Sequence, residues 1–298
     1  MITVGFGIHG LSQWFNNDIS KVVELVRLVD AKGVDQVNIT DHLAMSDNVG
    51  TYPAGQFLWG MEFSWWEPIV VLSAIASVTT RIRLNTAALI SPLRPALLLA
   101  KQLATLDQLS KGRVSIGLGA GWHREEFDAV NAPFETRFSY LCEQVSAMRA
   151  LWSESPASFH GAHINFDGLY CFPQPVQKHM PVLLALPATE RNIERMGELA
   201  DGWIPMLLEP DEFADAIGKI HAAMRRHGRD PKDFIVLCNP SPQLTKGEPD
   251  FDATIARMPD YIKAGISHFD FWPMSWCKGP AEFPAFIDRV MDVKRAFS

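Results

Sequence analysis

Two histidines stand where an imidazole could exchange a proton with a bound molecule. His42 follows Asp41 at the end of a short β-branched stretch, and His9 ends a similar stretch near the N-terminus. An imidazole gains or loses a proton near neutral pH, and a neighbouring carboxylate can select its tautomer. We therefore take His42 as the candidate catalytic residue. Alternatively, a backbone carbonyl could satisfy either ring, and Asp41 could cap the loop that follows it.

A glycine-rich stretch is the second candidate for chemistry. Residues 117–121 read Gly-Leu-Gly-Ala-Gly, and Trp122 follows them. Glycines let a backbone approach a flat ring or a phosphate closely. The stretch lacks the third glycine of the dinucleotide-binding G-x-G-x-x-G motif, and a tight turn into the next helix would need the same residues. Residues 124–126 then read as a first helical turn whose two glutamates face the positive end of the helix dipole.

Aromatic side chains crowd the segments after the first, second and last expected strands. Clusters of this kind often line an apolar pocket, although packing in the core would explain some of the rings. Residues 43–66 are long, aromatic-rich and follow a strand end, which predicts a mobile lid. The candidates for the wall of a substrate pocket are His9, Trp14, Trp59, Trp66 and Trp272.

Motifs of several other enzyme classes are absent from the sequence. It contains no H-E-x-x-H, no G-x-S-x-G and no G-x-x-x-x-G-K-[ST], and the first strand ends in a single His9 rather than a His-x-His pair. The candidate residues are poor in nucleophiles and metal ligands, which suits an enzyme whose chemistry is done by a bound organic cofactor. We expect no metal, and a metal-dependent barrel hydrolase is the alternative outside this class.

The secondary-structure elements that must position these residues are predicted from the spacing of apolar residues, which alternates along the chain between stretches typical of strands and stretches typical of helices. Ile19, Val22, Val23 and Val26 follow the helical spacing, and similar patterns recur between β-branched stretches. Eight strand–helix units imply parallel strands that close into a single-domain (β/α)8 TIM barrel spanning residues 1–298, whereas an open doubly wound sheet usually needs fewer units. The strands are expected at 3–8, 36–40, 82–88, 114–118, 182–185, 202–206, 234–238 and 268–272.

The composition of the chain limits which binding partners and which cellular compartment are expected. The net charge is −7 with no block of Lys or Arg, so no nucleic-acid partner is expected. Four separate cysteines without a C-x-x-C suit a reducing cytosol, and no secretory signal pattern opens the chain. The longest apolar stretch is too short to span a bilayer. We therefore expect a cytoplasmic protein without a membrane partner.

Several segments together resemble the bacterial luciferase-like monooxygenase superfamily. They keep the order and spacing of that family over nearly the whole chain, and they are specific in aggregate. This family is a TIM barrel that binds FMN or the deazaflavin coenzyme F420 across the C-terminal mouth of the barrel. The segments are 117–127, Pro133 with Phe134, Arg137, Glu67 with Pro68, 77–84, 173–177 and 200–203.

The resemblance implies cofactor contacts at the strand ends, with a non-proline cis peptide between Ala87 and Ala88 behind the ring. Two departures matter. Leu186 and Pro187 replace the usual Gly-Gly near the cofactor's phosphate end, and proline has no N–H to donate. Trp122 stands where sugar-phosphate dehydrogenases of the family carry a catalytic Glu. The implied cofactor-binding residues are Asp41, His42, Ala87, Ala88, Gly119, Ala120, Gly121, Trp122, Ala185, Leu186, Pro187 and Ala188.

The expected function is hydride transfer between coenzyme F420 and a small, mostly apolar organic substrate. The first alternative is a two-component monooxygenase that uses FMNH2, which would draw on a separate cofactor reductase. A flavin-binding protein without turnover is a further alternative. The resemblance also implies a homodimer.

Overall fold

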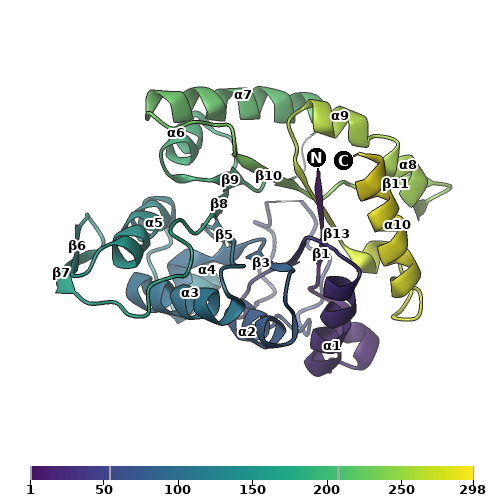
Figure 1. Ribbon diagram of the computed structural model, residues 1–298, viewed down its shortest axis with the longest axis horizontal. Helices are drawn as coiled ribbons and strands as arrows, with labels where there is room; N and C mark the ends of the chain where they lie inside the picture. The colour runs from purple at the N-terminus through teal and green to yellow at the C-terminus, as the bar shows by residue number, and fades with distance from the viewer. Residues whose placement is uncertain (1, 54, 207–208, 298) are drawn as a thin grey trace.

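A barrel of parallel strands forms the centre of the molecule, and helices surround it (Figure 1). The computed structural model describes residues 2–53, 55–206 and 209–297. The barrel strands are β1 (Thr3–Gly7), β2 (Gln36–Ile39), β3 (Arg83–Thr86), β4 (Leu89–Ile90), β5 (Ile116–Gly119), β8 (Val182–Ala185), β9 (Gly202–Trp203), β10 (Ile235–Cys238) and β13 (His268–Phe271). They pair in the order β3-β2-β1-β13-β10-β9-β8-β5-β4. A parallel bridge between Leu84 and Val114 brings the two ends of this sheet together.

The structure confirms the predicted TIM-like barrel. Each expected strand is present, with its ends shifted by a few residues. The third expected strand is interrupted: β3 ends at Thr86, the Ala87–Ala88 peptide is cis, and pairing resumes in β4. The non-proline cis peptide therefore lies where the family resemblance implied one.

Helices alternate with the strands and cover the outside of the barrel. They are α1 (Ile19–Ala31), α2 (Pro68–Val78), α3 (Ala96–Ser110), α4 (Arg124–Ala129), α5 (Arg137–Ser153), α6 (Glu190–Leu199), α7 (Pro210–Arg226), α8 (Phe251–Ile255), α9 (Met258–Lys263) and α10 (Phe283–Ala296). Short 3-10 turns are η1 (Leu11–Phe15), η2 (Ser91–Leu93) and η3 (Pro273–Ser275). Gly33, Gly112 and Gly228 have positive φ after α1, α3 and α7, as expected for helix C-caps. No helix in the described ranges is long and apolar enough to cross a membrane.

Two hairpins were not predicted from the sequence. β6 (Ala157–His160) pairs with β7 (Asn165–Leu169), and β11 (Gln243–Thr245) pairs with β12 (Glu248–Asp250), both antiparallel. Their side chains are mostly exposed or half-buried. Without a buried face, such strands carry little of the hydrophobic alternation by which strands are recognised.

Alternate residues of β1 face opposite sides of the barrel wall. Phe6 is fully buried and packs on Phe283 of α10, with ring centroids 5.2 Å apart. Gly5 and Gly7 face the interior, because a Cβ at Gly7 would lie 2.4 Å from Trp272 Cδ1. Glycine on β1 therefore leaves interior space to side chains from the neighbouring strands.

Close packing inside the barrel predicts opposite effects for two glycine-to-alanine changes. A Cβ at Gly117 of β5 would lie 2.1 Å from the Thr86 carbonyl oxygen and 2.4 Å from Ile204 Cδ1. Gly117→Ala should therefore destabilise the protein by about 2–3 kcal/mol. A Cβ added at Gly218 of α7 would meet no atom within 4 Å outside the backbone of its own helix. Gly218→Ala should therefore stabilise the protein by about 0.5–1 kcal/mol. Denaturant midpoints check both, and an unchanged midpoint for Gly117→Ala would contradict the described packing.

Candidate active site

His42 lies at the C-terminal end of β2 and is held by a carboxylate from another unit of the barrel. Its Nδ1 is 2.8 Å from Glu126 Oε2, and both side chains are buried. Glu126 Oε1 also accepts hydrogen bonds from the backbone N–H groups of Leu43 (2.6 Å) and Ala44 (3.3 Å). Because a carboxylate only accepts, it places the imidazole proton on Nδ1 and leaves Nε2 for a bound molecule.

Glu126 was not predicted from the sequence as a functional residue. Glu125 and Glu126 together were expected to form the acidic first turn of a helix, and both do lie in the first turn of α4. The contact with His42 joins residues 84 positions apart. Only the position of this helix, directly after the glycine-rich strand end, could have pointed to Glu126.

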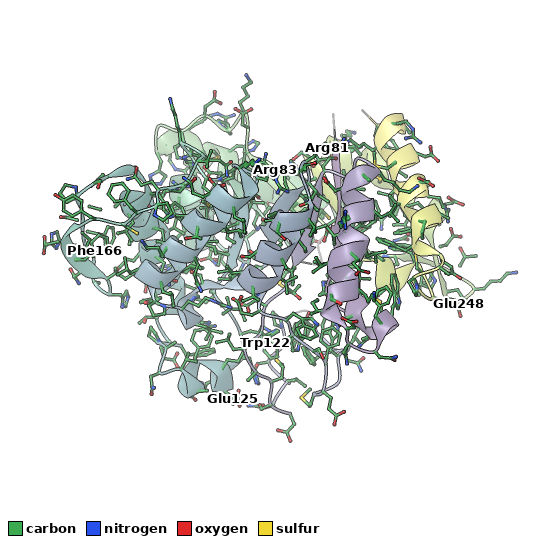
Figure 2. The ribbon with its side chains drawn as sticks, turned by 60° about the horizontal axis from the view of Figure 1, so that its bottom comes forward. Arg81, Arg83, Trp122, Glu125, Phe166 and Glu248 are labelled. Atoms are coloured by element: carbon green, nitrogen blue, oxygen red, sulfur yellow. The ribbon has the colours of Figure 1, made fainter. Side chains whose placement is uncertain are left out.

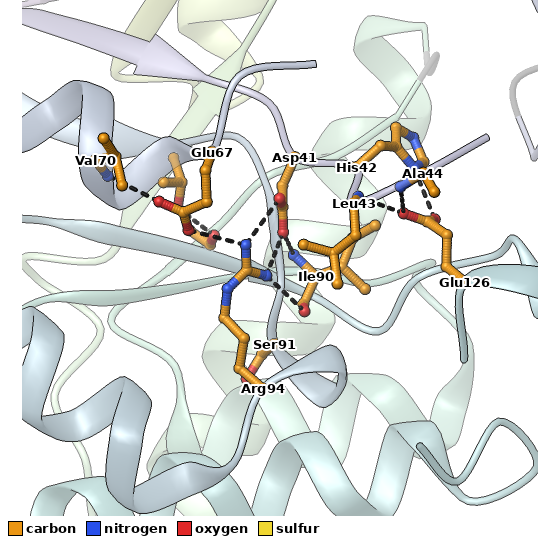
Figure 3. A network of polar contacts seen from close by, with 12 residues as sticks. Asp41, His42, Leu43, Ala44, Glu67, Val70, Ile90, Ser91, Arg94 and Glu126 are labelled. Atoms are coloured by element: carbon orange, nitrogen blue, oxygen red, sulfur yellow. Dashed lines mark hydrogen bonds and ion pairs between the residues drawn. The ribbon is translucent and has the colours of Figure 1, made fainter. Parts of the chain in front are cut away.

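Asp41 faces the other side of the same loop, as Figure 3 shows. Its carboxylate accepts hydrogen bonds from Arg94 Nη1 (2.6 Å), Arg94 Nη2 (3.0 Å) and the backbone N–H of Ile90 (2.9 Å). Arg94 also pairs with Glu67 at 3.0 Å. Burial alone would lower the pKa of Arg94, but Asp41 and Glu67 raise it. The Asp41 carboxylate is thus occupied by hydrogen bonds within the protein.

Aromatic rings and two histidines form one connected group over the strand ends, which we call the mouth cluster. His42 packs edge-on against Trp65 (centroids 4.8 Å apart) and Trp122 (5.7 Å), and His9 packs against Trp272 (4.6 Å). Figure 2 places Trp122 and Glu125 at one end of the barrel and Arg81 and Arg83 at the other. The members are His9, His42, Tyr52, Phe57, Trp59, Phe63, Trp65, Trp122 and Trp272.

Two of the expected pocket residues, Trp14 and Trp66, have no ring contact with the mouth cluster among the described residues. Trp14 packs on Phe283 of α10 with centroids 5.9 Å apart, and Trp66 Nε1 donates to Ser12 Oγ at 3.1 Å. Both rings are partly buried against the hydrophobic core. Trp66 also lines a small pocket together with His9 and Trp65. His9, Trp59 and Trp272 do meet in the mouth cluster.

The floor beneath the mouth cluster is built from small residues of three strand ends. A Cβ at Gly119 would lie 3.4 Å from the Ala88 Cβ and 3.9 Å from the Ala185 Cβ. Ala87 is half-buried beside Ala88, and Ala120 is buried. A floor without long side chains suits the face of a flat ring.

The loop after β5 and the loop after β8 are both fixed by side chains. Gly121 has φ of 78°, and its carbonyl oxygen accepts from Arg137 Nε at 3.0 Å. The Leu186 carbonyl accepts from Trp203 Nε1 (2.9 Å), and the Pro187 carbonyl accepts from Asn192 Nδ2 (3.0 Å). Ala188 follows half-buried and leads into the N-terminus of α6.

The electrostatics of the mouth favour an uncharged occupant. Burial lowers the pKa of His9 to about 4, so its ring is neutral at pH 7. Thr40 Oγ1 and Trp65 Nε1 are buried without a hydrogen-bond partner among the described residues. No group of three or more His, Cys, Asp or Glu in the described part of the chain could hold a metal ion, so the metal-dependent hydrolase has no ligand set here.

Comparison with known proteins identifies the class of this barrel. The luciferase-like monooxygenase family matches residues 3–262, and the chain belongs to this family. An uncharacterized protein of Mycobacterium tuberculosis is 41% identical over 164 residues, which are 54% of this chain and 58% of that protein. Pyrimidine monooxygenase RutA of Variovorax paradoxus is 29% identical over 210 residues, 68% of this chain and 54% of RutA. The chain thus aligns with little more than half the length of these relatives.

Solved structures share the fold at low sequence identity. An F420-dependent secondary alcohol dehydrogenase in complex with an F420-acetone adduct has a TM-score of 0.70 at 17% identity, covering 91% of this chain and 93% of that one. Monooxygenase RslO1 from Streptomyces bottropensis has a TM-score of 0.67 at 21% identity, covering 88% and 78%. At these identities the likeness shows the shared barrel.

The buried ion pair of Arg94 with Asp41 generates a prediction about stability. Arg94→Met leaves the carboxylates of Asp41 and Glu67 without their cation, so it should cost about 3–5 kcal/mol. Arg289→Met is the control, because its pair with Asp252 is exposed (49% and 89%) and should be worth about 0–1 kcal/mol. Chemical denaturation measures both, and equal losses would show that the Arg94 pair does not brace the loop.

Proposed function

We propose that this protein is an oxidoreductase that transfers a hydride between coenzyme F420 and a small, mostly apolar substrate. The observation that carries the proposal is the His42–Glu126 contact of 2.8 Å at the edge of the small-residue floor. It presents a tautomerically defined imidazole beside the surface where a flat ring fits. The consecutive residues Asp41 and His42 resemble the Asp-His sequence of the deazaflavin branch of the family, and this supports F420 over FMN.

The residues present fit a flat-ring cofactor. Ala87, Ala88, Gly119 and Ala185 would support its face, and the backbone at 119–122 would border its edge. The segment 185–188 would lie toward its phosphate end, before the N-terminus of α6, where helix N–H groups favour an anion. When bound, the deazaflavin supplies the hydride chemistry.

The chain's own residues would position the substrate and manage a proton. His42 would hold or deliver a proton at Nε2 to the substrate oxygen, while Glu126 stabilises the positive charge that forms on the ring. The mouth cluster would exclude water and bind apolar groups of the substrate. Because His9 is neutral at pH 7, its ring offers no positive charge to an anionic substrate group.

A monooxygenase that uses FMNH2 is the second candidate. It is favoured by the 29% identity to pyrimidine monooxygenase RutA over 68% of this chain. This function would require a separate cofactor reductase as a partner. For either function we propose a cytoplasmic homodimer without a nucleic-acid or membrane partner.

Replacing His42 tests the proton role. His42→Ala should lower turnover by roughly 10²–10⁴-fold without loss of folding, as is usual for a missing acid–base group. Glu126→Gln should lower turnover by about 10–100-fold, since it keeps the shape but removes the charge behind the ring. Glu125→Gln is the matched control, because that neighbouring side chain contacts the Asn48 side chain and His123 rather than His42. If Glu125→Gln loses as much activity as Glu126→Gln, the contact between Glu126 and His42 is not the cause of the lower turnover.

A cofactor titration decides between the two candidate functions. The cofactor-free protein is titrated with coenzyme F420 and with FMN, binding is followed by fluorescence, and turnover is assayed with and without oxygen. We expect F420 to bind more tightly and turnover to be independent of oxygen. Tight FMN binding with oxygen-dependent product, and no binding of F420, would establish the monooxygenase instead.

A further inference from the structure

A second pocket lies at the end of the barrel opposite the mouth. It is open to solvent and has a volume of about 570 Å³, within the roughly 300–1,000 Å³ that is usual for small-molecule sites. Figure 2 shows Arg81 and Arg83 at this end of the barrel, away from Trp122 and Glu125. The proton transfer proposed at His42 makes no use of this pocket. Its charged and polar lining residues are Thr3, Asp35, Arg81, Arg83 and Lys294.

The pocket lies where three adjacent strands begin. Thr3 is the first residue of β1, Arg83 is the first residue of β3, and Asp35 directly precedes β2. The Asp35 N–H donates to the Val4 carbonyl at 3.0 Å, and the Arg83 N–H donates to the Asp35 carbonyl at 2.9 Å. Lys294 of α10 is tied to the same point, because its Nζ donates to Asp35 Oδ1 at 2.5 Å. The barrel wall and α10 therefore hold the lining residues in place.

Positive charge exceeds negative charge around this pocket. Arg81, Arg83 and Lys294 line it, and Asp35 is the single carboxylate among the lining residues that are described. The Asp30 carboxylate lies near Arg81, but the backbone N–H groups of residues 80, 81 and 82 already bond to it, at 2.8, 3.1 and 2.7 Å. The chain as a whole carries a net charge of −7. A local excess of positive charge on an acidic protein attracts anions.

Hydrogen-bond donors also exceed acceptors at this end of the barrel. The Arg83 guanidinium, Thr3 Oγ1 and Gln36 Nε2 have no hydrogen-bond partner among the described residues, and the last two atoms are buried. Gln36 is 4% exposed and lies in register with Arg83 on the neighbouring strand, so the two side chains share a face of the sheet. Rotation about the Cα–Cβ bond of Thr3 would turn its hydroxyl toward the pocket, and no hydrogen bond opposes that rotation. Buried donors without partners are costly, and the oxygens of an anion would supply acceptors.

A phosphate group matches these donors better than a carboxylate does. A phosphomonoester carries a charge of about −1.5 to −2 at pH 7 and three acceptor oxygens, whereas a carboxylate has one charge and two oxygens. A guanidinium fork binds phosphate through two parallel hydrogen bonds, and Arg81 and Arg83 supply two forks. The pocket volume of about 570 Å³ leaves room for an organic group beyond the phosphate.

We propose that the N-terminal end of the barrel is a second binding site, for the phosphate group of a small organic phosphomonoester held by Arg81 and Arg83 with the Thr3 hydroxyl. The site is independent of the proposed function, because no residue of the mouth cluster lines the pocket. The ligand would connect the starts of β1 and β3, two strands whose other ends lead to the candidate active site. Binding should therefore stabilise the folded protein.

Calorimetric titration of the purified protein with glycerol 3-phosphate tests the site, at low ionic strength because salt screens exposed charges. We expect saturable binding of one ligand per chain. Arg83→Gln should weaken this binding by roughly 10–100-fold, the size of a lost hydrogen bond to a charged group. Thr3→Val keeps the shape of the side chain and should weaken binding by roughly three- to tenfold. Arg225→Gln is the matched control, because it removes the same charge from an exposed arginine of α7 outside the pocket, and it should bind as wild type does.

Two comparison ligands and a competition experiment complete the test. Inorganic phosphate should bind more weakly than glycerol 3-phosphate, and succinate more weakly still. Saturating F420 or FMN should leave the affinity for glycerol 3-phosphate unchanged, and displacement by either cofactor would place the phosphate at the mouth and overturn the proposal. It would also be overturned if neither phosphate compound binds saturably, if succinate binds as tightly as glycerol 3-phosphate, or if Arg225→Gln loses as much affinity as Arg83→Gln. If Arg83→Gln does not fold, unchanged affinity in Thr3→Val would overturn it.

Discussion

The hydrogen bonds accepted by the buried Glu126 carboxylate determine how His42 and the start of the following loop are held at the mouth of the barrel. Glu126 lies in the first turn of α4 and reaches back to His42 and to the two backbone N–H groups that follow. A buried carboxylate is costly unless it is hydrogen-bonded on all sides, and these three donors supply that compensation. The same bonds fix the tautomer of His42 and the start of the loop. Asp41 adds the opposite anchor through Arg94, so the loop is held by carboxylate contacts on both sides.

The barrel interior contains a hydrogen-bonded polar layer, and small residues lie at several of the strand ends. Lower in the barrel, Asn38, Asn85 and Asp270 fill the space with hydrogen-bonded polar groups. Toward the mouth, Gly119 and Ala88 leave the strand ends without long side chains. A barrel of this size is normally packed full by side chains. Under the proposed function, the small residues at these strand ends would leave room for the face of a flat ligand.

The strands and the convergence of their ends could be predicted from sequence, because a parallel barrel brings every C-terminal strand end to one mouth whatever the side chains are. The structure joins His9 to His42 in this way through the rings of Trp59 and Trp65. Residues in loops had no such constraint. Trp14 and Trp66 lie in such segments, and the structure packs Trp14 on Phe283 of α10 and bonds Trp66 to Ser12 of η1. Periodicity says nothing about where the side chains of such segments pack.

The partners of the buried charges were also beyond prediction. Asp41 and Arg94 are 53 positions apart, and His42 and Glu126 are 84 apart. The helical turn that carries Glu126 was expected, but its acidic character has a sufficient local explanation in the helix dipole. Pairing across units depends on which face of each loop turns inward, and the register of the barrel alone does not determine this.

The segment 43–66, predicted to be a lid, is held by hydrogen bonds near its start and by ring contacts farther along. Residues 43–48 are tied to the region of α4 through Glu126, through His123, which accepts from the Ser46 N–H at 3.0 Å, and through Glu125, which bonds Asn48 at 2.6 Å. Beyond them, Phe57 and Trp59 contact the mouth cluster through their rings. Each aromatic pair contributes about 0.5–1.5 kcal/mol beyond its buried area, and a ligand ring can replace such a contact. Under the proposed function, this division would let a substrate exchange against the aromatic rings while His42 stays held by the Glu126 carboxylate.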